Sequence, residues 1–405
     1  MTTMRPIRET IPLEEALALL TAAAVPVART ERVPIRDAHN RVLACDIVSG
    51  HDVPPFDRAA MDGYAVIARD TFGAGRYEPK VLRCIETVYT GQMPARRISP
   101  GECIEIATGA PMPDGADAVV MVEETEKADG AAVRIFTPVY PRQHVGPRAA
   151  DIAAGQRILT MGQLLNPSRI GALAAIGAGD VDVFARPRVA ILSTGNEIVE
   201  PGQPLAPGQI YDINQFTLSS VIGAHGGVAV RGETAPDTLA ALVDAMRHAA
   251  IEDMVVFSGG SSVGARDLLL DALQSAGEVI FHGIAVKPGK PMVFGRVGQT
   301  PVLGMPGYPT SCLSNAYLLL VPLLRLIARL PEHHPLSVRM PLSRRIVSTT
   351  GRRQFYTVRI VDGVATPAFK ASGDITSMAH ADGYIEIPAQ TDMVEAGEIV
   401  EVKVF

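Results

Sequence analysis

Four short apolar runs between residues 189 and 313 each end in a turn rich in glycine or proline. They read VAILSTGNEIV, MVVFSGGSSVGARD, GIAVKPGKPMVFG and VLGMPGYPTSCL. Three intervening segments, 219–224, 238–251 and 267–277, carry aliphatic residues at helical spacing. Strand, turn and helix in alternation predict a parallel sheet in an α/β domain. Ligands bind at the carboxyl ends of the strands in such a sheet, so the polar turn residues are the first candidates for a site.

The pattern of hydrophobic and polar residues changes on both sides of this stretch. Short strand-like segments separated by turns fill residues 64–140, and strand-like patterns return after the PEHHP linker. We therefore predict a multidomain protein of class α/β plus β. The predicted domains are a small discontinuous helical domain (1–47 and 145–185), a β-rich domain inserted into it (48–144), the α/β domain (186–330) and a C-terminal β-barrel domain (331–405).

The amino-acid composition favours some classes of protein function and argues against others. The chain has 405 residues, 47% of them hydrophobic and 20% charged, which is typical of a soluble globular enzyme. A net charge of −6 without a dense basic run argues against nucleic-acid binding. Four scattered cysteines without a CxxC pair indicate neither a disulfide framework nor a zinc site, and they fit a reducing cytoplasm.

Membrane insertion is not expected either. The first residues lack the apolar region of a signal peptide. The longest apolar stretch, 316–330, is interrupted by Pro322, Arg325 and Arg329, so it predicts a buried helix rather than a bilayer span.

The KPGKP motif at residues 287–291 is the most informative short motif, because it holds two of the six lysines in the chain. A compact ammonium group suits a phosphate or another oxyanion. The two prolines stiffen the turn, and Gly289 lets the backbone approach a ligand. The alternative interpretation is a rigid surface turn with solvated lysines.

The SGGSSVGARD segment, 258–267, offers glycines and serines whose backbone N–H groups can face an anion. Asp267 either binds a metal or only caps the helix that follows. The segment is not a Walker A motif, and no GxGxxG or HExxH pattern occurs. The residues themselves thus indicate an enzyme of anionic, phosphorylated small molecules, with lysines holding the anion and carboxylates holding a divalent metal.

Seven motifs in order resemble those of the molybdopterin molybdenumtransferases, the MoeA family, which includes the C-terminal domain of gephyrin. They are PPFDRAAMDGYAV, TGAPMPDGADAVV, ILSTGNEIV, GQIYDINQF, SGGSSVGARD, VKPGKPMVFG and MPGYPTS. The resemblance covers nearly the whole chain and is weakest toward the C-terminus. It implies insertion of molybdenum from molybdate into adenylylated molybdopterin, with release of AMP and with Mg²⁺ as the divalent metal.

The resemblance also implies how the protein assembles. Family members form homodimers of four-domain subunits, with the cleft between the α/β domain of one subunit and the β-domain of the other. We therefore expect a cytoplasmic homodimer that binds adenylylated molybdopterin and molybdate, without nucleic acid or membrane. A molybdopterin adenylyltransferase is a further expected partner.

The site residues carry over from the motifs by position. The implied catalytic residues are Asp62, Thr108, Asp151, Glu197, Asp267, Lys287 and Lys290, and the implied metal ligands are Asp62, Glu197 and Asp267. The implied substrate-binding residues are Ser193, Thr194, Gly195, Ser258, Gly259, Gly260, Gly289, Pro306, Pro309 and Ser372.

Five positions depart from the family pattern: Ala59, Ala150, Ala235, Ala265 and Tyr308. Together they leave fewer carboxylates than the family pattern has. These changes leave room for altered chemistry or for a different oxyanion such as tungstate. Two other functions stay open. One is adenylylation of molybdopterin, whose catalysts share the α/β domain, although the three additional domains favour insertion. The other is a non-enzymatic scaffold role like the second function of gephyrin.

Overall fold

The computed structural model describes residues 9–232, 234–259 and 268–405, and the chain divides into two compact units. The larger unit comprises Met1–Arg32, Asn40–Val42 and Asp182–Phe405. The smaller unit comprises Val33–His39 and Leu43–Val181.

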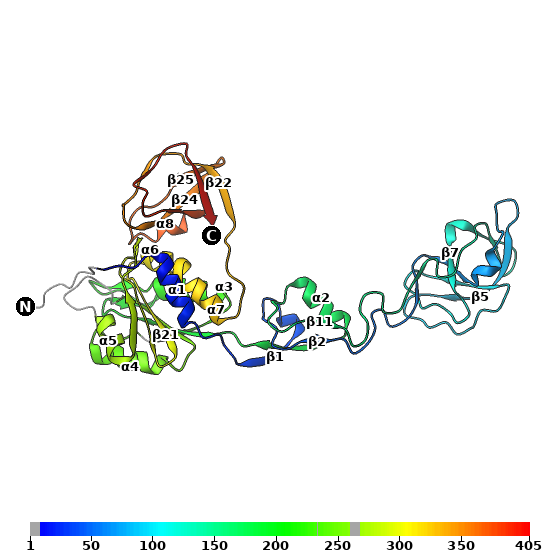
Figure 1. The fold of residues 1–405 in the computed structure, drawn as a ribbon, viewed down its shortest axis with the longest axis horizontal. Helices are drawn as coiled ribbons and strands as arrows, with labels where there is room; N and C mark the ends of the chain where they lie inside the picture. The colour runs from blue at the N-terminus through cyan, green and yellow to red at the C-terminus, as the bar shows by residue number, and fades with distance from the viewer. Residues whose placement is uncertain (1–8, 233, 260–267) are drawn as a thin grey trace, which may run out of the picture. The chain divides into compact units, whose positions relative to one another are not determined.

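A six-stranded mixed sheet forms the centre of the larger unit (Figure 1). In their order across the sheet, the strands are β16 (Val228–Arg231), β13 (Arg188–Ser193), β17 (Met254–Ser258), β21 (Thr300–Met305), β20 (Val293–Val297) and β18 (Glu278–His282). The first four are parallel, as predicted, but β20 and β18 are antiparallel to their neighbours. Only two residues, Gly298 and Gln299, join β20 to β21, and so short a link reverses the chain, whereas a parallel neighbour needs a long crossover.

Alternate residues of the strands face two different helical layers. Val189 and Ile191 of β13 face one core, whereas Ala190 and Leu192 face the other. The first layer holds α1 (Leu13–Ala23), α3 (Asn214–Ala224), α6 (Pro309–Asn315) and α7 (Val321–Ile327). The second holds α4 (Leu239–Ala249) and α5 (Leu268–Ala276), seen on the opposite side of the sheet in Figure 1.

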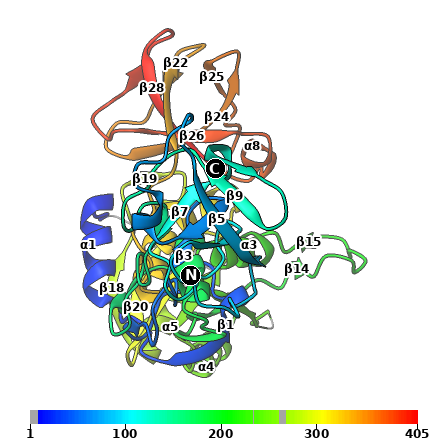
Figure 2. The ribbon, with the colours of Figure 1, turned by 90° about the vertical axis from the view of Figure 1, so that its right-hand side faces the viewer.

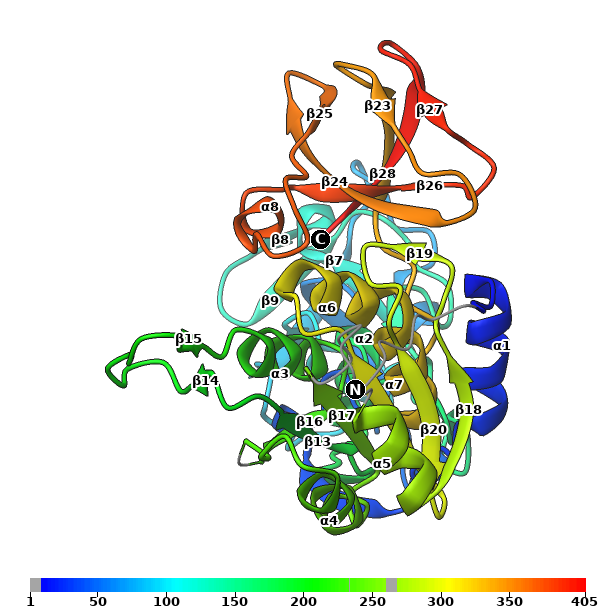
Figure 3. The ribbon, with the colours of Figure 1, turned by 90° about the vertical axis from the view of Figure 1, so that its left-hand side faces the viewer.

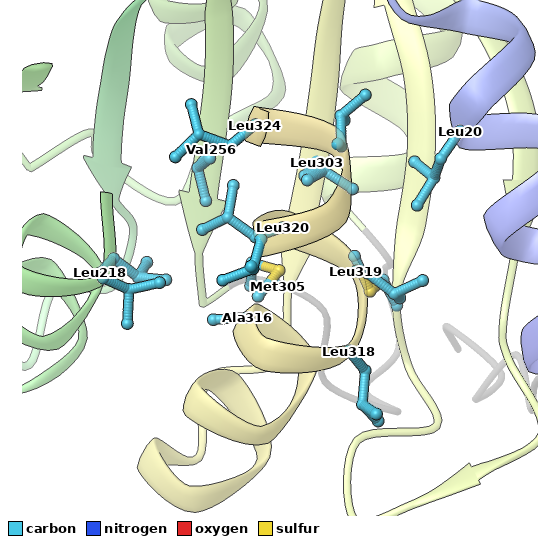
Figure 4. Close-up of a cluster of buried hydrophobic side chains, with 14 of the residues drawn as sticks. Leu20, Leu218, Val256, Leu303, Met305, Ala316, Leu318, Leu319, Leu320 and Leu324 are labelled. Atoms are coloured by element: carbon cyan, nitrogen blue, oxygen red, sulfur yellow. The ribbon is translucent and has the colours of Figure 1, made fainter. Parts of the chain in front are cut away.

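The helical stretch Pro309–Ile327 is long and apolar enough to cross a membrane, and it is the one such stretch within the described ranges. It consists of α6, the π-helical turn η4 (Ala316–Leu320) and α7. Of its apolar window, 72% is buried in the protein. Leu318, Leu319 and Leu320 lie among side chains of β17, β21 and α3 (Figure 4). The prediction of a buried helix here is confirmed.

Helix α1 packs in the larger unit. Leu13, Ala16 and Leu20 lie in the same core as α7. The expectation that all of residues 1–47 pack with 145–185 therefore differs from the structure at this helix, because the apolar face of α1 is buried against α7. The boundaries of the four predicted domains stay a prediction.

The C-terminal part of the larger unit is a mixed sheet that resembles half of a barrel (Figure 3). Its strands, in order, are β19 (Val286–Lys287), β24 (Arg353–Val361), β26 (Gly383–Ile387), β28 (Ile399–Val404) and β22 (Ser337–Pro341), with β25 (Val364–Pro367) paired to β24. The pair β23 (Ile346–Val347) and β27 (Met393–Val394) and the short helix α8 (Thr376–Ala379) complete this part. A closed barrel stays a prediction. Strand β19 comes from the KPGKP segment, so this sheet reaches into the α/β part of the same unit.

The smaller unit has its own six-stranded mixed sheet, with one apolar core on each face. Its strands, in order, are β7 (Ala118–Met121), β4 (Gly63–Val66), β6 (Glu102–Ile106), β5 (Lys80–Val88), β9 (Ala132–Ile135) and β8 (Thr125–Lys127). The remainder of this unit includes α2 (Pro167–Ala175) and the pairs β2 (Ile47–Val48) with β11 (Arg157–Leu159) and β3 (Arg58–Ala59) with β10 (Val145–Gly146). Helix α2 begins with Pro167 in its first turn, and the Asn166 side chain accepts the Arg169 N–H.

Candidate functional site

Three strands of the larger unit end side by side at one edge of the sheet. Ser193 at the end of β13 lies in register with Ser258 at the end of β17, and Ser258 lies in register with Met305 of β21. The two serine hydroxyl oxygens are 3.4 Å apart, and the Thr194 N–H donates to the Ser258 carbonyl at 3.1 Å. The structure thus brings the predicted binding residues Ser193, Thr194, Ser258 and Gly259 together.

The Thr194 hydroxyl is a buried polar group beside a glycine. The residue is only 3% exposed, and Oγ1 has no hydrogen-bond partner among the described residues. Gly259 has a φ of +99°, and a Cβ there would lie 2.6 Å from the Thr194 carbonyl oxygen. Only glycine fits this close approach, so Gly259 lets the two strand ends pack tightly beside the Thr194 hydroxyl. Gly260 and Asp267 lie outside the described residues.

Two polar residues at the start of α3 belong to this edge, and neither is a predicted site residue. Asp212 is buried, and its carboxylate accepts hydrogen bonds from the Ser193 hydroxyl and from the Gln215 N–H. Asn214 donates from Nδ2 to the Gly307 carbonyl oxygen at 2.9 Å. The signal was an aspartate and an asparagine immediately before a helical pattern, which is typical of a helix start.

Glu197 lies after β13, just before the paired segments β14 (Ile198–Val199) and β15 (Ile210–Tyr211), which extend away from the sheet (Figures 2 and 3). Gly195 has a φ of +135°, and a Cβ there would lie 2.8 Å from each Glu197 carboxylate oxygen. The Glu197 carboxylate is therefore folded over Gly195, which was predicted to bind substrate.

Asp237 is a second carboxylate whose pKa is affected by the charge of Glu197. Burial raises the pKa of Asp237, and the negative charge of Glu197 raises it further. Ala235 bridges to Thr194 and donates its N–H to the Ser193 carbonyl at 2.9 Å. Ala235 itself carries no carboxylate, but Asp237 provides one two residues further along the chain. Carboxylate oxygens are the donors that a hard divalent cation takes, so Glu197 and Asp237, whose charges interact, fit Mg²⁺ by their chemistry.

The KPGKP turn is held from two sides. Lys287 Nζ donates to Thr349 Oγ1 at 2.6 Å, and β19 pairs with β24 in parallel. On the other side, Asn315 at the end of α6 donates from Nδ2 to the Gly289 carbonyl oxygen at 2.8 Å. Gly289 has a φ of +100°, and a Cβ there would lie 2.5 Å from Asn315 Nδ2. The Lys290 carbonyl accepts the N–H of Ile284 at 3.1 Å, so the turn is not a loose surface loop.

The MPGYP turn meets the C-terminal segment that contains Ser372. Pro306 follows β21 and Pro309 opens α6. The Thr310 N–H donates to the Ser372 carbonyl at 3.1 Å, and Thr310 Oγ1 donates to the Asp374 carbonyl at 3.0 Å. Tyr308, which departs from the family pattern, is 67% exposed. The structure therefore places Ser372 beside the predicted binding turn.

Asp62 and Thr108 come together in the smaller unit. Asp62 lies between β3 and β4, and Thr108 follows β6. The Thr108 N–H donates to Asp62 Oδ1 at 2.7 Å, and this hydrogen bond lowers the pKa of the Asp62 carboxyl. Asp62 is therefore an exposed, fully ionised carboxylate at neutral pH.

Asp151 lines an open cavity of about 410 Å³ beside α2, together with Arg157 and Ser168. Its N–H donates to the Val53 carbonyl at 3.0 Å. The predicted metal set is not assembled in the described part of the chain, where no group of three or more His, Cys, Asp or Glu could hold a metal ion. Asp62 belongs to the smaller unit and Glu197 to the larger. These ligand assignments stay predictions.

Comparison with known families gives three matches along the chain. Residues 11–177 match the MoeA N-terminal region (domain I and II), residues 190–326 match a probable molybdopterin binding domain, and residues 339–405 match the MoeA C-terminal region (domain IV).

Characterised relatives match over nearly the full length. Molybdopterin molybdenumtransferase 2 of Mycobacterium tuberculosis is 36% identical over 95% of this chain and 97% of its own. The molybdopterin molybdenumtransferase of Nostoc sp. is 33% identical over 92% of this chain and 88% of its own. The solved molybdopterin biosynthesis MoeA protein from Pyrococcus horikosii is 41% identical, with a TM-score of 0.85, over 98% of this chain and 99% of that one.

Proposed function

We propose, on the premise that this chain belongs to the MoeA family of molybdopterin molybdenumtransferases, that it inserts molybdenum from molybdate into adenylylated molybdopterin and releases AMP. The observation that carries the proposal is the anchored KPGKP turn. Thr349 and Asn315 hold Lys287 and Gly289 from two sides, in the same unit as the strand edge of Ser193 and Ser258.

The chemistry brings several negative charges together, because phosphate and molybdate oxygens meet in one reaction. In the proposal, Lys287 and Lys290 hold the phosphate as compact point charges. The Thr194 hydroxyl and the glycine backbone at Gly259 bind the substrate at the strand edge.

Glu197 and Asp237 would hold Mg²⁺, in addition to the predicted ligands Asp62 and Asp267. When bound, the metal offsets the negative charge of the phosphate and oxometal oxygens. Asp62, with its position set by the Thr108 N–H, supplies a fixed carboxylate in the smaller unit.

We also propose the finer features that the resemblance implies. These are a cytoplasmic homodimer, a four-domain subunit with a closed C-terminal barrel, and delivery of the substrate by a molybdopterin adenylyltransferase. Sedimentation of the purified chain tests the dimer, and a monomer of 43.0 kDa with full activity contradicts it.

AMP release tests the function. Purified protein receives adenylylated molybdopterin, molybdate and Mg²⁺, and the released AMP is measured. We expect Asp62→Asn and Glu197→Gln to bind the substrate but to release little AMP. Asp62→Asn is well matched, because an asparagine keeps the oxygen that accepts the Thr108 N–H and loses only the charge.

The control is Asp114→Asn, a change at an exposed aspartate of the same unit, which should leave AMP release unchanged. Wild-type protein that binds the substrate but releases no AMP above background contradicts the proposal and favours the scaffold role. AMP attached to molybdopterin by the wild-type protein, from ATP, favours the adenylylation alternative.

A further inference from the structure

Two cysteines face each other across neighbouring strands of the smaller unit. Cys84 of β5 and Cys103 of β6 are register partners in a parallel strand pair. Both side chains turn into the same core, which also contains Tyr64 and Leu82. Cys103 is fully buried, whereas Cys84 is half-buried and reachable from solvent.

The general spacing of paired strands suits a disulfide bond between Cys84 and Cys103. Neighbouring strands lie about 4.8 Å apart. Disulfides join residues whose Cα atoms are roughly 4.4–6.8 Å apart. The strand pairing shifts register between Cys84 and Glu86, and such an irregularity re-aims the side chains next to it. The Cys84 thiol donates to the Glu86 carbonyl oxygen at 3.3 Å, at the same irregularity.

Their different surroundings make the two thiols chemically unequal. The Cys103 thiol lowers the pKa of Cys84 to about 6, while its own pKa is raised by the same interaction and by burial. At pH 7, a larger fraction of Cys84 is therefore thiolate than of an ordinary thiol. The reactive, accessible sulfur therefore has a buried, protonated sulfur beside it.

We propose that Cys84 and Cys103 are an oxidation site that forms a reversible disulfide when the protein meets a hydroperoxide. The Cys84 thiolate attacks a peroxide oxygen, the O–O bond breaks, and a sulfenic acid and one hydroxide or alkoxide form. The Cys103 sulfur then attacks the sulfenic sulfur, so that the S–S bond forms and the S–O bond breaks. The Cys103 proton leaves with that oxygen as water. Two thiols supply the two electrons that reduce the peroxide, and an external dithiol reverses the reaction.

The experiment uses the full chain at pH 7 with one equivalent of hydrogen peroxide. We expect the number of free thiols to fall from four to two, with a Cys84–Cys103 linked peptide in a non-reducing digest. Dithiothreitol should restore all four. Cys45 and Cys312 serve as internal controls and should stay reduced, because Cys45 lies in another part of the unit and Cys312 is buried in the larger unit.

Two variants separate the roles of the partners. Cys103→Ala should leave Cys84 as a sulfenic acid that dimedone traps, whereas Cys45→Ser should form the disulfide like the wild type. Over-oxidation of Cys84 while Cys103 stays a thiol overturns the proposal, as does a linked peptide that contains Cys45 or Cys312.

The pH profile of the wild-type reaction is a second test, and it does not require any variant to fold. The rate of peroxide consumption should rise with a midpoint near pH 6. A midpoint near that of an ordinary thiol, about 8.5, overturns the proposal.

Discussion

The side-chain amide of Asn315 donates a hydrogen bond to the carbonyl oxygen of Gly289 at 2.8 Å. Asn315 is fully buried, at the junction of α6 and the π-helical turn η4. A polar side chain inside an apolar helix is costly unless it is hydrogen-bonded, and Gly289 provides its acceptor. The helix therefore sets the shape of the turn that carries Lys287 and Lys290.

Gly289→Ala tests this relationship. A Cβ at this position would lie 2.5 Å from Asn315 Nδ2, and the φ of +100° is unfavourable for alanine. We expect weaker binding of adenylylated molybdopterin and a loss of about 2 kcal/mol or more in the free energy of unfolding. Urea unfolding and titration calorimetry measure both.

Gly298→Ala is the matched control. Gly298 also has a positive φ, of +63°, but a Cβ there would meet nothing within 4 Å. It should show the backbone cost alone, about 1–2 kcal/mol, with unchanged substrate binding. Equal losses in both variants would mean that the Asn315 contact does not matter.

Lys287→Ala and Lys290→Ala should each weaken binding of the adenylylated substrate without unfolding the protein. A hydrogen bond to a charged group contributes roughly 1.5–3 kcal/mol, so the affinity should fall on the order of ten- to a hundredfold. Lys287→Arg should also bind less well, because a planar guanidinium does not replace a compact ammonium at Thr349. Lys80→Ala in the smaller unit is the control. Unchanged affinity in both alanine variants would mean that the two lysines do not bind the substrate and that KPGKP has only a structural role.

Asp237→Asn should raise the Mg²⁺ concentration required for AMP release. The charges of Asp237 and Glu197 interact, and loss of one of these two carboxylates should weaken metal binding roughly tenfold or more. Binding of Mn²⁺, followed by electron paramagnetic resonance, provides a measurement that does not depend on turnover. Asp244→Asn, at an exposed position of α4, is the control. An unchanged Mn²⁺ affinity would remove Asp237 from the site.

His225 should make the protein less stable in mild acid. The residue is 9% exposed, its ring lies edge-on to that of His333 at 4.8 Å, and Nδ1 has no partner among the described residues. Burial, with the charges of His333 and Arg325, lowers the pKa of His225 to about 4. In the unfolded chain its pKa is about 6.5, so the unfolded state binds the proton first as the pH falls. The contribution of neutral His225 is present above pH 6.5 and is lost toward pH 4.

Unfolding in urea at pH 7, 5.5 and 4.5 measures this effect. His225→Phe keeps an aromatic ring against His333 and should lose less stability between pH 7 and 4.5 than the wild type. His334→Phe, at an exposed neighbour, should follow the wild-type curve. Parallel pH curves for His225→Phe and the wild type would contradict the assignment.

Local patterns predicted several strands and turns that form the candidate site. The apolar runs identified β13, β17 and β21, and the rarity of lysine drew attention to KPGKP. Both signals are local, because strand periodicity and turn chemistry depend on neighbouring residues. The antiparallel direction of β20 could also be predicted from the sequence, since the two-residue link at Gly298 excludes a parallel crossover.

Only the tertiary structure revealed which distant residues meet. Asn315 and Gly289 are 26 residues apart, and nothing near either one indicates the other. Asp237 became a candidate only because its charge interacts with that of Glu197 in the folded chain, and Cys84 became a partner of Cys103 only through the order of β5 and β6. The sequence by itself thus determined the elements, the polar turns at their ends and the family. The pairing of those turns depended on strand order and helix packing, because these arise from burial of apolar faces over the whole chain.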